Sequence, residues 1–160
     1  MKGVSKMKRK IYLAYGSNMS LLQMYHRCPD AAPIGRGLIK DYRLMFKGSK
    51  SGNYATIEYE KGQMVPVVAW AISARDEKYL DRYEGFPSFY IKDTLEFEII
   101  NNGSGKRKKA LGLVYVMPPE NSELGLPSDG YMDVLLEGYH RFGFQEKILW
   151  DAYDYSDVNG

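Results

Sequence analysis

The stretch Ile11–Met19, Ile-Tyr-Leu-Ala-Tyr-Gly-Ser-Asn-Met, restricts the fold more than any other part of the chain. Its first half is apolar and aromatic without a charge, which is typical of a buried strand. Gly16–Asn18 end that strand, and Ser20 opens a helical pattern with Gln23 at the spacing of a capping box. A strand, a tight turn and a helix in this order point several backbone N–H groups at one spot, which suits a carboxylate or a phosphate. The glycine would allow close approach of a ligand and a positive φ. An ordinary turn without a ligand would share this pattern.

Length and composition describe one ordinary globular domain. The 160 residues can bury a sizeable core, and 44% hydrophobic with 26% charged residues is usual for a globular protein. The net charge of +2 is too small to indicate a nucleic-acid or membrane partner. No stretch approaches the roughly 20 apolar residues that span a bilayer. Cys28 is the single cysteine, so no intrachain disulfide can form, and we expect a protein of the reducing cytoplasm.

No repeat, low-complexity block or long linker divides the chain. We expect residues 1–8 to form a disordered extension, residues 9–155 a single domain, and residues 156–160 a short tail.

The hydrophobic patterns predict six or seven strands and four helices. Ser73, with Asp76 three residues later, and Ser128 are expected to cap two helices, which Gly85 and Gly143 would end. Most strands follow one another through turns, without regular crossover helices, which indicates an α+β fold with a mainly antiparallel or mixed, barrel-like sheet. Besides the first strand, strands are expected at Ile34–Leu38, Tyr42–Phe46, Tyr54–Tyr59, Val65–Ile72, Tyr90–Ile100 and Ala110–Met117, a hairpin turn at Asn101–Gly105, and helices at Ser20–Arg27, after Ser73, after Ser128 and at Gln145–Tyr153.

Several common kinds of site lack support in the sequence. His26 and Cys28 are two residues apart at a helix end, a spacing that points their side chains apart, which argues against a Cys–His nucleophile. His26 and His140 are the only histidines, and neither has a carboxylate at a metal-binding spacing, so we expect no metal site. No nucleotide-phosphate motif occurs. The basic run Lys106–Lys109 fits a solvated hairpin tip better than an RNA contact, because no aromatic residue interrupts it.

Glu84 is the most promising acid-base residue. It lies in Arg-Tyr-Glu-Gly-Phe-Pro, at the predicted last turn of a helix, where the negative end of the helix dipole raises a carboxyl pKa. Tyr83, Phe86 and Phe89 would add desolvation if the side chain points inward. Both effects favour general acid-base use near neutral pH. An exposed glutamate at a helix end is the alternative.

Four blocks, in the expected order, make the chain resemble the gamma-glutamylcyclotransferase-like family. Tyr15–Met19 is similar to the Tyr-Gly-Ser-Asn signature of that family, and Leu80–Gly85 followed by Tyr90 is similar to the block that holds its catalytic glutamate. The later landmarks of the family match Tyr115, Pro127, Ser128, Tyr131 and Gly138. The likeness covers roughly residues 10–153.

The resemblance implies a small mixed barrel with flanking helices and a metal-independent cyclotransferase of the acyltransferase or lyase type, without a cofactor. Such an enzyme cyclises a gamma-glutamyl amino acid, amine or peptide to 5-oxoproline and releases a free amine. The implied catalytic residue is Glu84, and the implied substrate-binding residues are Tyr15, Gly16, Ser17, Asn18, Met19, Tyr90, Tyr115 and Tyr131.

Three points stay open. The segment Glu84–Pro87 resembles family branches with different leaving groups, so the leaving group is undetermined. The protein could be a monomer or a homodimer. A non-catalytic small-molecule-binding or interaction domain on the same fold is the alternative to an enzyme.

Overall fold

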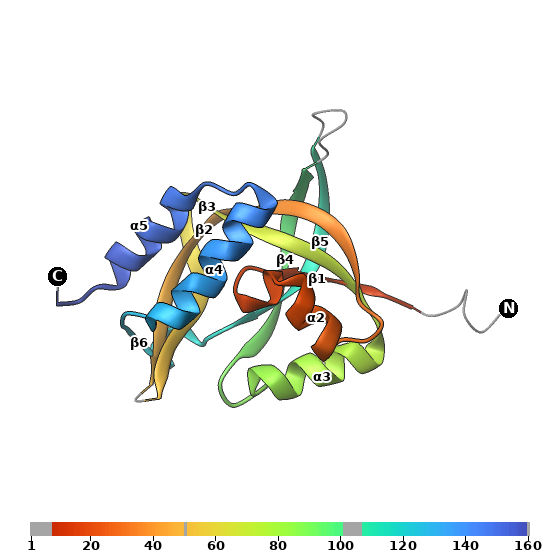
Figure 1. The fold of residues 1–160 in the computed structure, drawn as a ribbon, viewed down its shortest axis with the longest axis horizontal. Helices are drawn as coiled ribbons and strands as arrows, with labels where there is room; N and C mark the ends of the chain where they lie inside the picture. Colours follow the sequence, from red (N-terminus) through yellow and green to blue (C-terminus); the bar gives the residue numbers. More distant parts are fainter. Residues whose placement is uncertain (1–7, 50, 101–106, 160) are drawn as a thin grey trace, which may run out of the picture.

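A mixed β-sheet that closes on itself forms the centre of the molecule (Figure 1). The structure is a computed structural model, and it describes residues 8–49, 51–100 and 107–159. The strands in these residues are β1 (Lys10–Ala14), β2 (Ala32–Ser49), β3 (Gly52–Ile72), β4 (Ile91–Ile100), β5 (Arg107–Val116) and β6 (Glu123–Leu124). The helices are α2 (Leu21–Arg27), α3 (Ala74–Glu84), α4 (Asp129–Phe142) and α5 (Glu146–Ser156), with short 3₁₀ helices η1 (Ser17–Met19) and η2 (Pro119–Asn121).

Five strands make the barrel. The strand order is β3-β1-β5-β4-β2-β6, and an additional pairing between β3 and β2 closes the first five into a ring. β1 pairs with β5 in parallel, whereas the other pairings are antiparallel. β6 pairs with the far end of β2, outside the ring. The predicted fold class, an α+β protein with a small mixed barrel and flanking helices, is therefore confirmed.

The predicted strand boundaries are wrong in the long hairpin. Ile34–Leu38 and Tyr42–Phe46 belong to one strand, β2, and Tyr54–Tyr59 and Val65–Ile72 belong to one strand, β3. The two strands pair along nearly their whole length. The hairpin turn expected at Asn101–Gly105 lies outside the described residues, although β4 and β5 on either side of it pair as predicted.

A bulge explains why these strands look interrupted in the sequence. The register shifts between Lys40 and Tyr42, where Asp41 has a φ of 63°, and Gly62 on the partner strand has a φ of 90°. The Gly62 N–H donates a hydrogen bond to Asp41 Oδ1 at 3.0 Å. A bulge bends a strand without ending it, so these polar residues mark a bend and not a turn.

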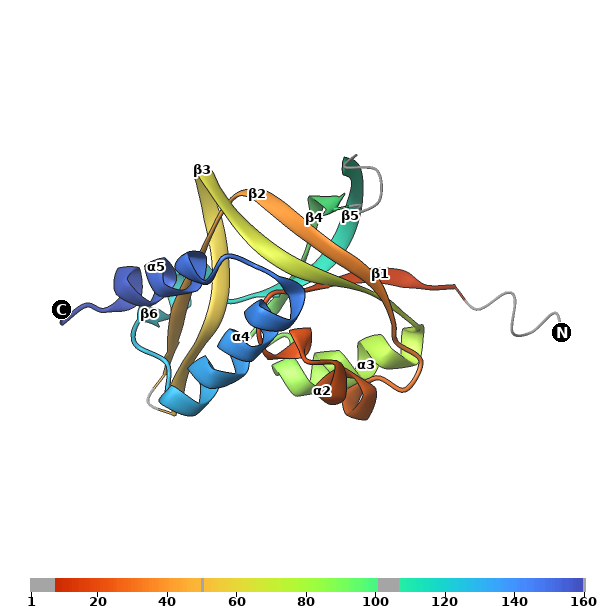
Figure 2. The same ribbon diagram turned by 45° about the horizontal axis from the view of Figure 1, so that its top comes forward.

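The helices occupy two places around the barrel. α2 and α3 lie side by side on one side of it, and α4 and α5 lie along the β2–β3 hairpin (Figures 1 and 2). The predicted caps of α2, α3 and α4 are confirmed as three serine N-caps and two glycines with positive φ, which are Ser20, Ser73, Ser128, Gly85 and Gly143. Ser156, placed in the tail by the sequence, ends α5 and is buried.

Large apolar side chains form one continuous core. Trp70, Tyr139, Phe46 and Phe97 are among the largest that are fully buried. Within the described ranges, no helix has the length and apolar character needed to cross a membrane.

Candidate active site

A cavity of about 420 Å³ opens where η1, the end of α3 and the start of α4 meet the barrel. Tyrosines are the commonest residues in its wall, and they come from β1, β3, α3, β5 and α4 as well as from the loops. The lining residues are Tyr12, Leu13, Tyr15, Gly16, Ser17, Asn18, Ser51, Tyr54, Ala55, Tyr83, Glu84, Phe89, Tyr90, Tyr115 and Tyr131. The turn and the glutamate, which are far apart in the sequence, thus share one cavity.

The turn leaves two backbone donors unused. The Met19 N–H donates to the Gly16 carbonyl at 3.1 Å, whereas the N–H groups of Ser17 and Asn18 have no acceptor among the described residues. The φ of Gly16 is −120°, so the positive φ considered from the sequence is absent. The need for a glycine at this position comes instead from limited space, because a Cβ there would lie 3.2 Å from the Tyr131 hydroxyl oxygen.

Glu84 is half-buried and faces the same cavity. Burial raises the pKa of its carboxyl from 4.5 to about 7, and the positive charge of Arg27 opposes part of that rise. In the described part of the chain, the carboxylate has no hydrogen-bond or ion-pair partner. An exposed glutamate at a helix end is therefore the wrong interpretation. This carboxyl group can exchange a proton near neutral pH and is available to a ligand.

Two tyrosine hydroxyls meet at the backbone of Ala55. Tyr90 Oη donates to the Ala55 carbonyl at 2.8 Å, and Tyr131 Oη accepts from the Ala55 N–H at 3.2 Å. Burial raises the pKa of both hydroxyls, so both are neutral at physiological pH. Because Tyr131 Oη acts as an acceptor here, its own proton remains available to a ligand.

The family follows from comparison with known proteins. The profile of a family described as "Gamma-glutamyl cyclotransferase, AIG2-like" matches residues 12–133, which include the turn, Glu84 and all the tyrosines of the cavity. This chain belongs to that family. The resemblance drawn from the four sequence blocks is confirmed.

Individual relatives agree with the family. A Homo sapiens protein named gamma-glutamylcyclotransferase is 28% identical over 150 residues, which cover 86% of this chain and 76% of that protein. A solved structure named gamma-glutamyl cyclotransferase has a TM-score of 0.78 at 25% identity and covers 91% of this chain and 86% of its own. The structure of an uncharacterized Homo sapiens protein has a TM-score of 0.77 at 26% identity, with coverage of 90% and 86%.

In this gamma-glutamyl cyclotransferase-like chain, Asn18 connects the turn to strand β1 and to helix α2. Asn18 Nδ2 donates to Tyr12 Oη at 3.0 Å, and Asn18 Oδ1 accepts a hydrogen bond from Arg27 Nη1 at the end of α2. The Arg27 guanidinium lies 3.5 Å from the ring centroid of Tyr83, the residue before Glu84. The turn is thereby held at a defined place relative to the glutamate.

The hydroxyls of Tyr15 and Tyr115 are engaged within the protein. Tyr15 Oη donates to the Tyr115 carbonyl at 2.5 Å, and Tyr115 Oη donates to Asp81 Oδ1 on α3 at 2.6 Å. Both side chains are buried and line the cavity. Their rings, and not their hydroxyl protons, are the parts available to a ligand.

Among the site residues expected from the sequence, the structure brings all but Met19 to the cavity wall. Met19 is buried, and its side chain lies against Gly138 on α4, where a Cβ would be 3.1 Å from Met19 Cε. The lining residues not assigned to the site are Tyr12, Leu13, Ser51, Tyr54 and Ala55, together with Tyr83 and Phe89, which the sequence placed beside Glu84. The high tyrosine content, 14 of 160 residues, is the sequence signal that could have pointed to the additional tyrosines of this cavity.

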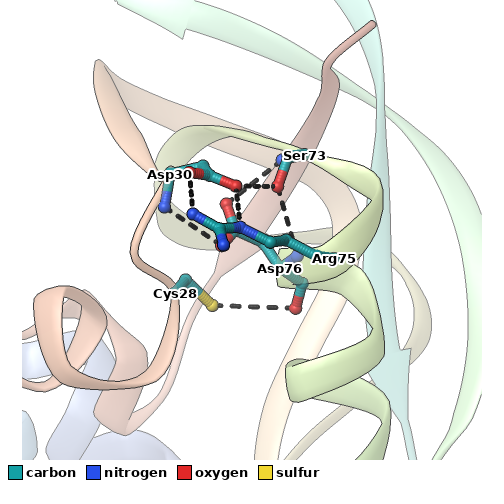
Figure 3. A network of polar contacts seen from close by, with 5 residues as sticks. All are labelled: Cys28, Asp30, Ser73, Arg75 and Asp76. Atoms are coloured by element: carbon teal, nitrogen blue, oxygen red, sulfur yellow. Dashed lines mark hydrogen bonds and ion pairs between the residues drawn. The ribbon is translucent and has the colours of Figure 1, made fainter. Parts of the chain in front are cut away.

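Cys28 belongs to a structural network and not to the cavity (Figure 3). Its thiol donates to the Asp76 carbonyl at 3.8 Å, and burial raises its pKa to about 12. A thiol with that pKa is not a nucleophile at neutral pH. No cluster of three or more potential metal ligands occurs in the residues that the structure describes.

Proposed function

We propose that this protein cyclises a gamma-glutamyl compound to 5-oxoproline and releases a free amine. The observation that carries the proposal is Glu84, a carboxyl with a pKa of about 7 and without a partner in the described residues, facing a cavity of about 420 Å³. Membership of the gamma-glutamyl cyclotransferase family supports the same reaction.

The chemistry needs one acid-base group and no enzyme nucleophile. The substrate α-amine attacks its own γ-carbonyl carbon, so a C–N bond closes the five-membered ring and the bond to the leaving amine then breaks. Because an α-amine has a pKa of about 8, it must lose a proton before it attacks. Glu84 in its ionised form takes that proton and later returns it to the leaving nitrogen. A carboxyl with a pKa of about 7 suits both steps near neutral pH.

The other cavity residues supply binding and shape. The unused N–H groups of Ser17 and Asn18 are candidates to hold the substrate α-carboxylate. Tyr131 can donate its remaining hydroxyl proton to a substrate oxygen. An intramolecular attack gains most from a substrate held in the ring-closing conformation, and the tyrosine walls would restrict it to that conformation.

The first experiment is to incubate the protein with gamma-glutamyl amino acids, gamma-glutamylamines and gamma-glutamyl peptides and to measure 5-oxoproline. Release from at least one of the three classes supports the proposal, and the class turned over fastest identifies the leaving group. Tight binding of a member without any 5-oxoproline would indicate the non-catalytic binding domain instead.

Glu84→Gln then tests the assigned residue. The amide keeps the size of the side chain but cannot accept the proton, so turnover should fall at least ~10²-fold. Binding of the substrate should survive with a loss of a few-fold, because the amide cannot pair with the substrate ammonium. Glu84→Asp should also lower turnover, since the shorter side chain moves the carboxylate away from the substrate α-amine.

Glu137→Gln, on an exposed position of α4, is the matched control and should leave turnover unchanged. A folded Glu84→Gln protein that forms 5-oxoproline at the parent rate would remove Glu84 from the mechanism.

A further inference from the structure

Tyr115 joins the two halves of the candidate active site through two different polar atoms. Its backbone carbonyl accepts the hydrogen bond from Tyr15 Oη at 2.5 Å, and Tyr15 directly precedes the turn at Gly16. Its hydroxyl donates to Asp81 Oδ1 at 2.6 Å, and Asp81 lies on α3 three residues before Glu84. Residues three apart on a helix share a face, so an anchor at Asp81 acts within one turn of Glu84.

A salt-bridge network strengthens the contact with α3. Lys92 on β4 is the register partner of Tyr115 on β5, so both side chains lie on the same face of the sheet. Lys92 Nζ lies 2.8 Å from Asp81 Oδ1 and 2.8 Å from Glu77 Oε2, one turn further back on α3. The last two turns of α3 are therefore held to the β4–β5 hairpin by two neighbouring side chains.

The Tyr115 hydroxyl has no proton left to donate to a substrate. A tyrosine hydroxyl carries one proton, and a carboxylate can only accept. Since that proton is directed at Asp81, Tyr115 cannot also donate to a substrate carboxylate or carbonyl oxygen. The substrate-binding role that the family resemblance implies for Tyr115 therefore cannot be hydrogen-bond donation by its hydroxyl.

We propose that Tyr115 is a positioning residue that acts through Asp81 to set the place of Glu84 relative to the turn. This inference rests on the proposed function. It assigns Tyr115 an effect on the chemical step, in which the Glu84 carboxylate must meet the substrate amine, and little effect on substrate affinity.

The test is a double-mutant cycle with kcat and KM measured separately. Tyr115→Phe keeps the ring in the cavity wall and removes the hydroxyl, so kcat should fall about 10-fold with KM within about 2-fold of the parent value. In an Asp81→Ala background the same Tyr115→Phe change should lower kcat less than 2-fold, because its anchor is already absent. An equal loss in both backgrounds, or a loss mainly in KM, would mean that the hydroxyl contacts the substrate and would overturn the proposal.

A matched control and a substrate-free measurement complete the design. Tyr139→Phe removes a buried hydroxyl that has no partner in the described residues and lies outside the cavity wall, so kcat should not change. Amide hydrogen exchange at Gly85 and Phe86, whose N–H groups bond to Arg82 and Asp81 carbonyls, should accelerate at least 5-fold in Tyr115→Phe and stay constant in Tyr139→Phe.

Unchanged exchange in Tyr115→Phe would overturn the positioning role whether or not the protein has activity. A parent protein that turns over no gamma-glutamyl compound, but whose exchange accelerates in Tyr115→Phe, would contradict the proposed function and leave the anchoring of α3 by Tyr115 supported. The two failures are therefore distinguishable.

Discussion

At the scale of single residues, this protein places a carboxyl group where water stabilises its charge poorly. Glu84 ends a helix, is half-buried in a cavity and has no cation in direct contact among the described residues. The positive charge that partly compensates it is Arg27, which is bonded to Asn18 and stacked on Tyr83. Such an arrangement makes the folded protein less stable when the carboxyl ionises.

The raised pKa of Glu84 predicts that the stability of the protein depends on pH. The pKa of Glu84 is about 7 in the folded state against an ordinary value of 4.5, so the folded protein binds more protons than the unfolded chain between these values. The free energy of unfolding therefore falls as pH rises from about 4.5 to about 7. Above that range, the loss caused by ionising Glu84 is complete. Glu84→Gln should remove a penalty on the order of 1–3 kcal/mol at pH 8.5 and very little at pH 4.

Chemical unfolding of the parent and of Glu84→Gln across this pH range measures the difference. Glu137→Gln removes one negative charge from an exposed position and serves as the control. A Glu84→Gln advantage that grows toward low pH would have the wrong sign and would contradict the raised pKa.

A side chain at Gly16 is predicted to interfere with ligand binding. A Cβ at this position would lie 3.2 Å from Tyr131 Oη and 3.7 Å from Ala55 Cβ, and the branched side chain of valine would intrude further into the cavity. Gly16→Val should weaken the binding of a gamma-glutamyl compound at least 10-fold, and Gly16→Ala should weaken it less. Measured in the Glu84→Gln background, dissociation constants report binding without turnover. Equal affinity in all three proteins would argue against a ligand at this turn.

At the scale of elements, the start of α3 is tied to the segment that follows α2 (Figure 3). Ser73 and Asp76 form a complete capping box. Ser73 Oγ also donates to Asp30 Oδ2 at 2.7 Å, and Arg75 pairs with both Asp30 oxygens at 2.6 and 2.7 Å. One end of α3 is thus held by this network, and the other end is held by Tyr115. Contacts at both ends fix the orientation of the helix and therefore the position of its last residue, Glu84, at the cavity.

Ser73→Ala should destabilise the protein by about 1–2 kcal/mol, because it removes an N-cap and leaves one Asp30 oxygen with fewer donors. Thermal or chemical unfolding measures the loss. Ser88→Ala, at an exposed position in the loop after α3, should stay within about 0.5 kcal/mol of the parent. Equal stability of the two variants would show that the cap contributes nothing.

At the scale of the whole molecule, barrel closure depends on the parallel contact between β1 and β5. Tyr12 pairs with Leu113 there, and the neighbouring Gly112 gives Leu13 the space it occupies. A Cβ at Gly112 would lie 2.6 Å from Leu13 Cγ, and Leu13 is fully buried. The core at this contact therefore has no room for even one methyl group.

Gly112→Ala should cost about 1–3 kcal/mol of unfolding free energy through overpacking. Gly130→Ala is the matched control, because a Cβ there meets nothing within 4 Å and the residue lies in the first turn of α4. That change should be neutral or stabilising by up to about 1 kcal/mol, since alanine favours a helix more than glycine does. The reverse order of stability in an unfolding experiment would contradict this account of barrel closure.

The sequence by itself determined the features that depend on neighbouring residues. The strand, turn and helix around Gly16, the serine caps, and the glycines that end α3 and α4 can all be predicted from short stretches, because their hydrogen bonds join residues three to five apart. The order of the four blocks was enough to identify the family, and with it Glu84 as the candidate acid-base residue.

Only the tertiary structure decided what depends on residues far apart in the chain. The bend shared by Asp41 and Gly62 makes one long hairpin from segments that look like four strands, since a bulge is defined by the partner strand. Tyr12 and Tyr54 reach the cavity, and Met19 does not, because barrel closure determines which side chains face it. A raised pKa of Glu84 was predicted, but whether its side chain is buried, like the bond from Tyr115 to Asp81, 34 residues away, depends on contacts that exist only once the chain has folded.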